Sequence, residues 1–101
     1  TAQEVAAIAQ ASVQMGLSAA VLVGVPVPVS AQIPAEHIRN LIAQAQNEAQ
    51  AQGIAGRDLT PFLLARLAEL TEGASTQANI ALLENNAGVA ADIAVALTRQ
   101  P

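Results

Sequence analysis

The sequence predicts an α/β protein, to which this chain contributes about four helices and one buried strand. Three observations support this: several stretches of helical hydrophobic spacing, a short and uniformly apolar run at residues 19–25, and a 52% hydrophobic content against 12% charged residues. Such a composition excludes intrinsic disorder. The 101 residues allow one domain at most and include a single aromatic residue, so the core is expected to be aliphatic and closely packed. We therefore expect residues 1–101 to form a single segment of a larger α/β domain.

The first helix is predicted over residues 2–15. Thr1 and Glu4 have the spacing of a capping box, in which a hydroxyl and a carboxylate each accept a hydrogen bond from a free backbone N–H group. Gly16 follows, and glycine readily adopts the left-handed conformation that ends helices. The face with helical spacing consists of Val5, Ile8, Ser12 and Met15.

Residues 19–25 are predicted to form the strand. A short, continuous apolar run is typical of a strand that is buried on both faces. Pro26 and Pro28 cannot donate to a sheet, so they belong to a loop at the sheet edge, where α/β proteins commonly bind ligands. This strand needs hydrogen-bonding neighbours that the chain does not supply, so we expect them elsewhere. The alternative is an isolated helical bundle with residues 19–25 as a core helix.

Two further helices are delimited by prolines and glycines. Pro34 suits the first turn of the second helix, which Gly53 ends. Thr60 and Pro61 have the pattern of an N-cap followed by proline at the first helical position, and Gly73 marks the end of this third helix. The second helix has an apolar stripe and an opposite face rich in glutamine.

A fourth helix is predicted from a cap at Ser75 to about Thr98. Asn79 and Asn86 lie two turns apart on its expected buried face, among leucine, isoleucine and alanine side chains. An unpaired buried amide costs about 1–3 kcal/mol, so something must satisfy each of them. The partner is either neighbouring backbone or a ligand such as a sugar hydroxyl, a nucleobase edge or a phosphate.

Charge and residue content exclude several classes of function. The net charge of −4 and the absence of lysine argue against nucleic-acid binding, and no lysine nucleophile or Schiff base is possible. There is no cysteine, and the single histidine, His37, is expected to be solvated in a first helical turn. The uncharged stretch from Val5 to Ala35 is interrupted by polar residues and prolines, so we expect no membrane span and a soluble, cytoplasmic protein.

Four motifs in order resemble the C-terminal part of the pseudouridine-5′-phosphate glycosidases, the indigoidine synthase A-like family. The motifs are Gly24-Val25-Pro26-Val27-Pro28, the stretch from Gly53 to Arg66, Ala78-Asn79-Ile80-Ala81-Leu82, and Asn85-Asn86-Ala87. The resemblance covers essentially this whole chain but only about the last third of the family protein. It implies that residues 1–101 are the C-terminal part of an α/β/α layered glycosidase domain.

The resemblance also implies an activity and its partners. A family enzyme reversibly cleaves the C–C glycosidic bond of pseudouridine 5′-phosphate to give uracil and ribose 5-phosphate, and is expected to be a cytoplasmic, Mn²⁺-dependent homotrimer. The lysine that opens the sugar ring, the proton-handling glutamate and the aspartate that serves the metal are expected in the missing N-terminal part. No catalytic or metal-binding residue is thus expected in this chain. The resemblance implies that Asn79 is the first candidate for a substrate-binding residue and that Asn86 is the second.

The alternative class of function is a non-catalytic helical protein-interaction module. It would use the apolar stripes of the second and third predicted helices as partner surfaces, namely Ile38, Leu41, Ile42, Leu63 and Leu67. The two hypotheses differ in what they require of the remaining polypeptide, because only the enzyme needs a lysine nucleophile and a carboxylate cluster.

Overall fold

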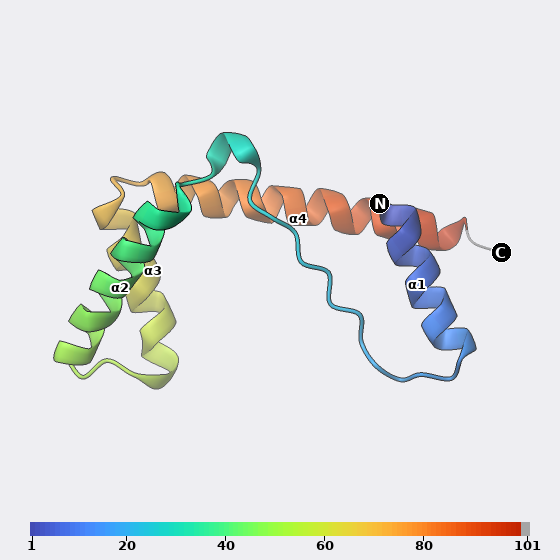
Figure 1. Ribbon diagram of the computed structural model, residues 1–101, viewed down its shortest axis with the longest axis horizontal. Coiled ribbons are helices and arrows are strands. Elements are labelled where there is room, and N and C mark those ends of the chain that lie inside the picture. Colours follow the sequence, from blue (N-terminus) through green and yellow to red (C-terminus); the bar gives the residue numbers. More distant parts are fainter. Residues whose placement is uncertain (100–101) are drawn as a thin grey trace. The chain divides into compact units, whose positions relative to one another are not determined.

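The computed structural model describes residues 1–99. Over these residues the chain forms the helices α1 (Ala2–Gln14), α2 (Ala35–Ala51), α3 (Leu59–Leu70) and α4 (Ala74–Thr98), together with the short 3-10 helices η1 (Val29–Ala31) and η2 (Gly56–Asp58) (Figure 1). The chain divides into two compact units. The first contains Thr1–Pro26 and the residues from Leu82 onward, and the second contains Val27–Ala81. Helix α4 contributes its early turns to the second unit and its later turns to the first.

The limits of α1 agree with the sequence prediction to within one residue. The Thr1 hydroxyl accepts a hydrogen bond from the Glu4 backbone N–H at 3.2 Å, and the Glu4 carboxylate accepts one from the Thr1 backbone nitrogen at 2.6 Å. At the other end Gly16 has a φ of 70°, and the Leu17 N–H donates to the Ser12 carbonyl. Both ends of α1 are therefore formed by the local hydrogen bonds that the sequence predicts.

Residues 19–25 form neither the predicted buried strand nor the core helix of the alternative. The structure has no strand among residues 1–99, and the residues Val21 and Leu22 are 46% and 97% exposed. The physical reason is that a strand needs hydrogen-bonding neighbours on its edges, and the described part of the chain contains none. An apolar run alone therefore does not make a strand, and the predicted α/β layering is not found among residues 1–99, which are mostly helical.

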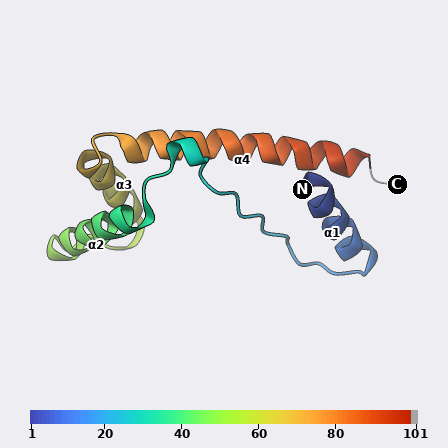
Figure 2. The ribbon, with the colours of Figure 1, turned by 45° about the horizontal axis from the view of Figure 1, so that its top comes forward.

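Helices α2 and α3 form a hairpin in the second unit, and they lie side by side in both views (Figures 1 and 2). Ala45 and Ala49, one turn apart on α2, are 0% and 1% exposed and belong to the buried core. Gly53 ends α2 with a φ of 68°, and the Ile54 N–H bonds the Ala49 carbonyl at 2.9 Å. The stop at Gly53 is thus confirmed, with the two hydrogen bonds of a Schellman motif.

The start of α3 differs from the prediction. The helix begins at Leu59 with Asp58 at the N-cap position, whose side chain makes no capping hydrogen bond. Thr60 and Pro61 therefore lie inside the first turn and are not the cap and first residue. Proline is tolerated there because the N–H groups of the first turn have no partner within the helix.

A tight turn joins α3 to α4 through two residues with positive φ, Glu72 at 52° and Gly73 at 87°. The Gly73 N–H donates to the Ala68 carbonyl at 2.8 Å, so the turn closes α3 as a Schellman motif with a glutamate in the left-handed position. The predicted cap at Ser75 is wrong, because α4 already begins at Ala74. Instead, the Thr71 hydroxyl accepts a hydrogen bond from the Ser75 N–H at 2.9 Å.

Helix α4 has the predicted C-terminal limit but not the predicted burial. Ala96 is its one buried residue among those described, whereas Leu83 is 58% exposed and Ile80 44%. It is also the one described helix that is long and apolar enough to cross a membrane by length and composition, a weak criterion that core helices of soluble proteins also meet. The expected buried face of α4 is thus largely uncovered.

Candidate functional site

An open hollow of about 210 Å³ lies within the first unit, between residues 23–25 and the later turns of α4. Asn86 is the one polar side chain that lines it. The remaining wall is aliphatic, with Val23, Val25, Leu82, Val89 and Ile93 among its residues. A mainly apolar recess with a single amide suits a small ligand that has both apolar surface and a polar group, since the amide both donates and accepts hydrogen bonds.

A hydrogen bond from Asn85 joins α4 to Pro26, which directly follows the wall residues 23–25. The Asn85 side-chain amide donates a hydrogen bond to the Pro26 carbonyl at 3.2 Å, across 59 positions in the sequence. Sequence reasoning assigned no role to Asn85, although it lies in the Asn-Asn-Ala motif directly before Asn86. Consecutive helical residues point about 100° apart, so one amide can bond the loop while the next lines the hollow.

The two sequence-predicted site residues lie in different units and are both exposed. Asn86 lies in the first unit and lines the hollow, whereas Asn79 lies in the second unit, on the early turns of α4. Neither amide makes a hydrogen bond within the described residues, and no buried polar side-chain atom there lacks a partner. The prediction that both amides are buried is therefore wrong. Their role in substrate binding stays a prediction.

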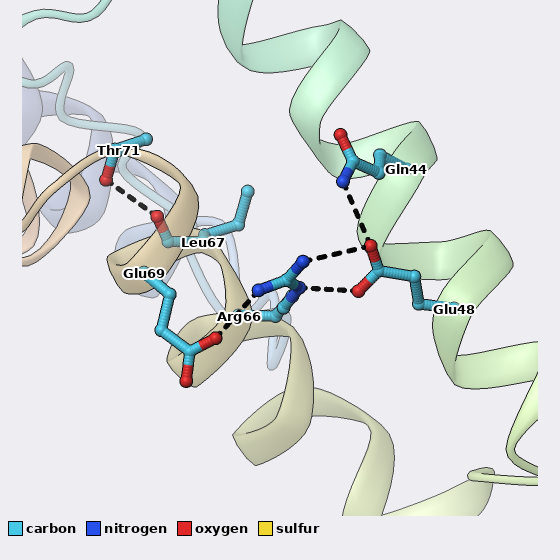
Figure 3. A network of polar contacts seen from close by, with 6 residues as sticks. All are labelled: Gln44, Glu48, Arg66, Leu67, Glu69 and Thr71. Atoms are coloured by element: carbon cyan, nitrogen blue, oxygen red, sulfur yellow. Dashed lines mark hydrogen bonds and ion pairs between the residues drawn. The ribbon is translucent and has the colours of Figure 1, made fainter.

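The strongest charged cluster of the described residues connects α2 to α3 (Figure 3). The Arg66 guanidinium bonds both oxygens of Glu48, through Nε and through Nη2, and also donates to Glu69 at 2.8 Å. The Gln44 amide donates to the same Glu48 carboxylate at 2.9 Å. The hydrogen bond from Arg66, followed by that from Gln44, lowers the pKa of Glu48. The hydrogen bonds that Arg66 donates to Glu48 and Glu69 raise the pKa of Arg66.

This cluster is suited to holding the hairpin together rather than to proton transfer. A general acid or base needs a pKa near the working pH, and the shifts of Glu48 and Arg66 both favour their charged forms over the neutral range. The bidentate contact is also the geometry in which arginine and carboxylate pair most specifically.

The described residues do not fit a metal ion. Among residues 1–99, no group of three or more histidine, cysteine, aspartate or glutamate side chains is placed to bind one. His37 is exposed in the first turn of α2, as the sequence indicated. Residues 1–99 therefore provide no set of donor atoms that would hold a metal ion.

Comparison with known proteins places the chain in a family. Residues 1–96 match the model of indigoidine synthase A like proteins, and the chain belongs to this family. Curated relatives carry a more specific name. The chain is 46% identical over 97 residues to a pseudouridine-5′-phosphate glycosidase of Kosmotoga olearia and 56% identical over 81 residues to one of Dinoroseobacter shibae. It is 43% identical over 99 residues to the same enzyme of Lysinibacillus sphaericus.

These matches cover most of this chain but a small part of each relative. They include 96%, 80% and 98% of the chain in the order given, but 34%, 27% and 33% of the relatives' own lengths. The chain thus spans about a third of the length of the curated relatives it matches. The family resemblance that the sequence motifs indicated is confirmed by these comparisons.

Proposed function

We propose that this chain is part of a pseudouridine-5′-phosphate glycosidase, which reversibly cleaves pseudouridine 5′-phosphate to uracil and ribose 5-phosphate. The observation that carries the proposal is the similarity to enzymes of that name over nearly the whole chain, at 46% identity across 97 residues in one case. The chain contains no lysine, so the lysine nucleophile expected of the family has to come from outside it. We propose that residues 1–101 form the C-terminal part and are inactive alone.

The part that this chain plays is substrate binding by side-chain amides. Asn79 and Asn86 are both exposed, and neither makes a hydrogen bond within residues 1–99, so both retain their donors and acceptors for a ligand. An amide matches the paired donor and acceptor groups of uracil and the hydroxyls of ribose. The aliphatic wall beside Asn86 adds a surface against which a flat ring packs.

Three further expectations for the intact enzyme belong to the proposal: Mn²⁺ dependence, a homotrimer and a cytoplasmic location. The residues of this chain described here do not fit a metal, so residues of the remaining polypeptide have to hold the ion. The test is metal removal from the intact protein by a chelator, followed by readdition of Mn²⁺ or Mg²⁺ and measurement of the restored rate.

The deciding experiment measures uracil release from pseudouridine 5′-phosphate by the intact protein, its Asn79→Ala and Asn86→Ala variants, and residues 1–101 alone. We expect release by the intact protein and none by the segment. Loss of one substrate hydrogen bond of about 1 kcal/mol lowers kcat/KM about fivefold in each variant. Asn47→Ala is the matched control, because Asn47 is an exposed amide in the C-terminal half of α2.

The outcomes separate the two classes of function. An intact protein that releases no uracil contradicts the enzyme, whereas unchanged kinetics of Asn79→Ala remove Asn79 from the site and leave the activity standing. The second candidate is a helical interaction module, favoured by exposed apolar side chains such as Leu83 at 58%. It predicts that a partner protein binds the intact chain and that no substrate is turned over.

A further inference from the structure

Val23 and Val25 form one wall of the hollow beside Asn86, and the segment to which they belong, residues 18–26, has no regular structure. No sheet holds this segment among the described residues, and Leu22 is 97% exposed. Ordering each backbone residue costs about 1–2 kcal/mol, and contacts with other elements offset that cost. The hydrogen bond from Asn85 to the Pro26 carbonyl is the side-chain hydrogen bond that ties this segment to another element within residues 1–99.

We propose that Asn85 is a positioning residue for substrate binding: its amide holds residues 23–26 against α4 and so preserves the hollow that Asn86 lines. The inference rests on the proposed function. It assigns to Asn85 a role distinct from that of Asn86, because Asn85 contacts the protein backbone and Asn86 faces the hollow. Its effect on the ligand is indirect, through the shape of the wall formed by Val23 and Val25.

The expected size of the effect on KM follows from the competent fraction, which is the fraction of molecules in which residues 23–26 lie against α4. A net intramolecular hydrogen bond contributes about 1 kcal/mol, which is about a fivefold bias. If its loss lowers the competent fraction to about one fifth, the apparent dissociation constant rises about fivefold, because affinity scales with that fraction. Chemistry in the bound complex is unaffected, since Asn85 does not touch the reacting atoms. A rise in KM with kcat within about twofold is the expected signature.

The kinetic test uses the intact protein and the Asn85→Asp variant, which keeps the side-chain size but replaces the donor with a carboxylate oxygen. Asn85→Gln keeps an amide donor, so its KM should lie between those of the wild type and Asn85→Asp. Asn47→Asp makes the same change of charge at an exposed position of α2 and should leave KM unchanged. An unchanged KM in Asn85→Asp overturns the proposal, and so does an equal rise in Asn85→Asp and Asn85→Gln.

A spectroscopic readout tests the contact without relying on activity. With ¹³C-carbonyl proline and ¹⁵N-valine labelling, this chain gives signals from two peptide bonds, Pro26–Val27 and Pro28–Val29. We expect Asn85→Asp to shift the Pro26 carbonyl signal and to leave that of Pro28, which accepts instead from the Ala31 N–H at 2.9 Å. Val27→Ala assigns the signal by deleting it. An unmoved Pro26 signal overturns the inference, whereas an inactive wild type overturns only the proposed enzyme.

Discussion

The turn between α3 and α4 contains a left-handed glutamate that glycine should replace with a gain in stability. Glu72 has a φ of 52°, where a residue with a Cβ costs about 1–2 kcal/mol, and its side chain makes no hydrogen bond or ion pair within residues 1–99. Glycine removes that cost but adds about 0.4–1 kcal/mol of unfolded-chain entropy. The net expectation for Glu72→Gly is a gain of about 0.5–1 kcal/mol in the free energy of unfolding of the 101-residue chain.

Two control variants separate backbone strain from charge. Glu72→Ala removes the carboxylate but keeps the Cβ, so it should change the free energy of unfolding by less than about 0.5 kcal/mol. Gly73→Ala introduces a Cβ at a φ of 87°, where no atom lies within 4 Å, so its cost of about 1 kcal/mol is purely conformational. The assay is urea unfolding followed by circular dichroism at 222 nm. Destabilisation by Glu72→Gly, or equal gains from glycine and alanine, would refute the reasoning.

Two further predictions concern the α2–α3 hairpin. Because Arg66 lowers the pKa of Glu48 from its ordinary value of 4.5, the Glu48 contribution to stability is present above about pH 4.5 and is lost as pH falls through the lowered folded pKa. The difference in thermal midpoint between wild type and Glu48→Gln should therefore shrink on acidification, and a constant difference from pH 7 to pH 2 contradicts it. Ala49→Leu should destabilise the chain by about 1–3 kcal/mol because Ala49 is 1% exposed, whereas Ala43→Leu at an exposed position of α2 should be nearly neutral in the same urea titration.

The helix limits were predictable wherever the signal is local in sequence. The pair Thr1 and Glu4, and the glycines Gly16 and Gly53, stop or start helices through bonds that span five residues or fewer. Such contacts depend little on the rest of the molecule. The start of α3 was missed because η2 places Asp58 and Leu59 already in helical geometry, so the Thr-Pro pattern falls two residues inside the helix.

The absence of a strand among residues 1–99 and the exposure of α4 were not predictable from this sequence, because both depend on contacts between distant elements that hydrophobic spacing does not specify. Residues 19–25 have the composition of a buried strand, yet composition supplies no hydrogen-bonding neighbour. The same holds for α4, where apolar residues recur around the helix while Leu83 and Val95 remain 58% and 47% exposed. Hydrophobic spacing therefore predicts which segments are helical, but not which other parts of the protein cover their apolar side chains.

The adjacent amides Asn85 and Asn86 show why a candidate site needs a structure as well as a motif. Spacing of seven residues selected Asn79 and Asn86, since both fall on one predicted stripe, and it passed over Asn85 because Asn85 lies off that stripe. In the structure Asn85 makes the bond across 59 positions to Pro26, and Asn86 lines the hollow. If KM depends on Asn85, side chains off the apolar stripe determine the shape of the site as much as those on it, and a search for binding residues has to include both.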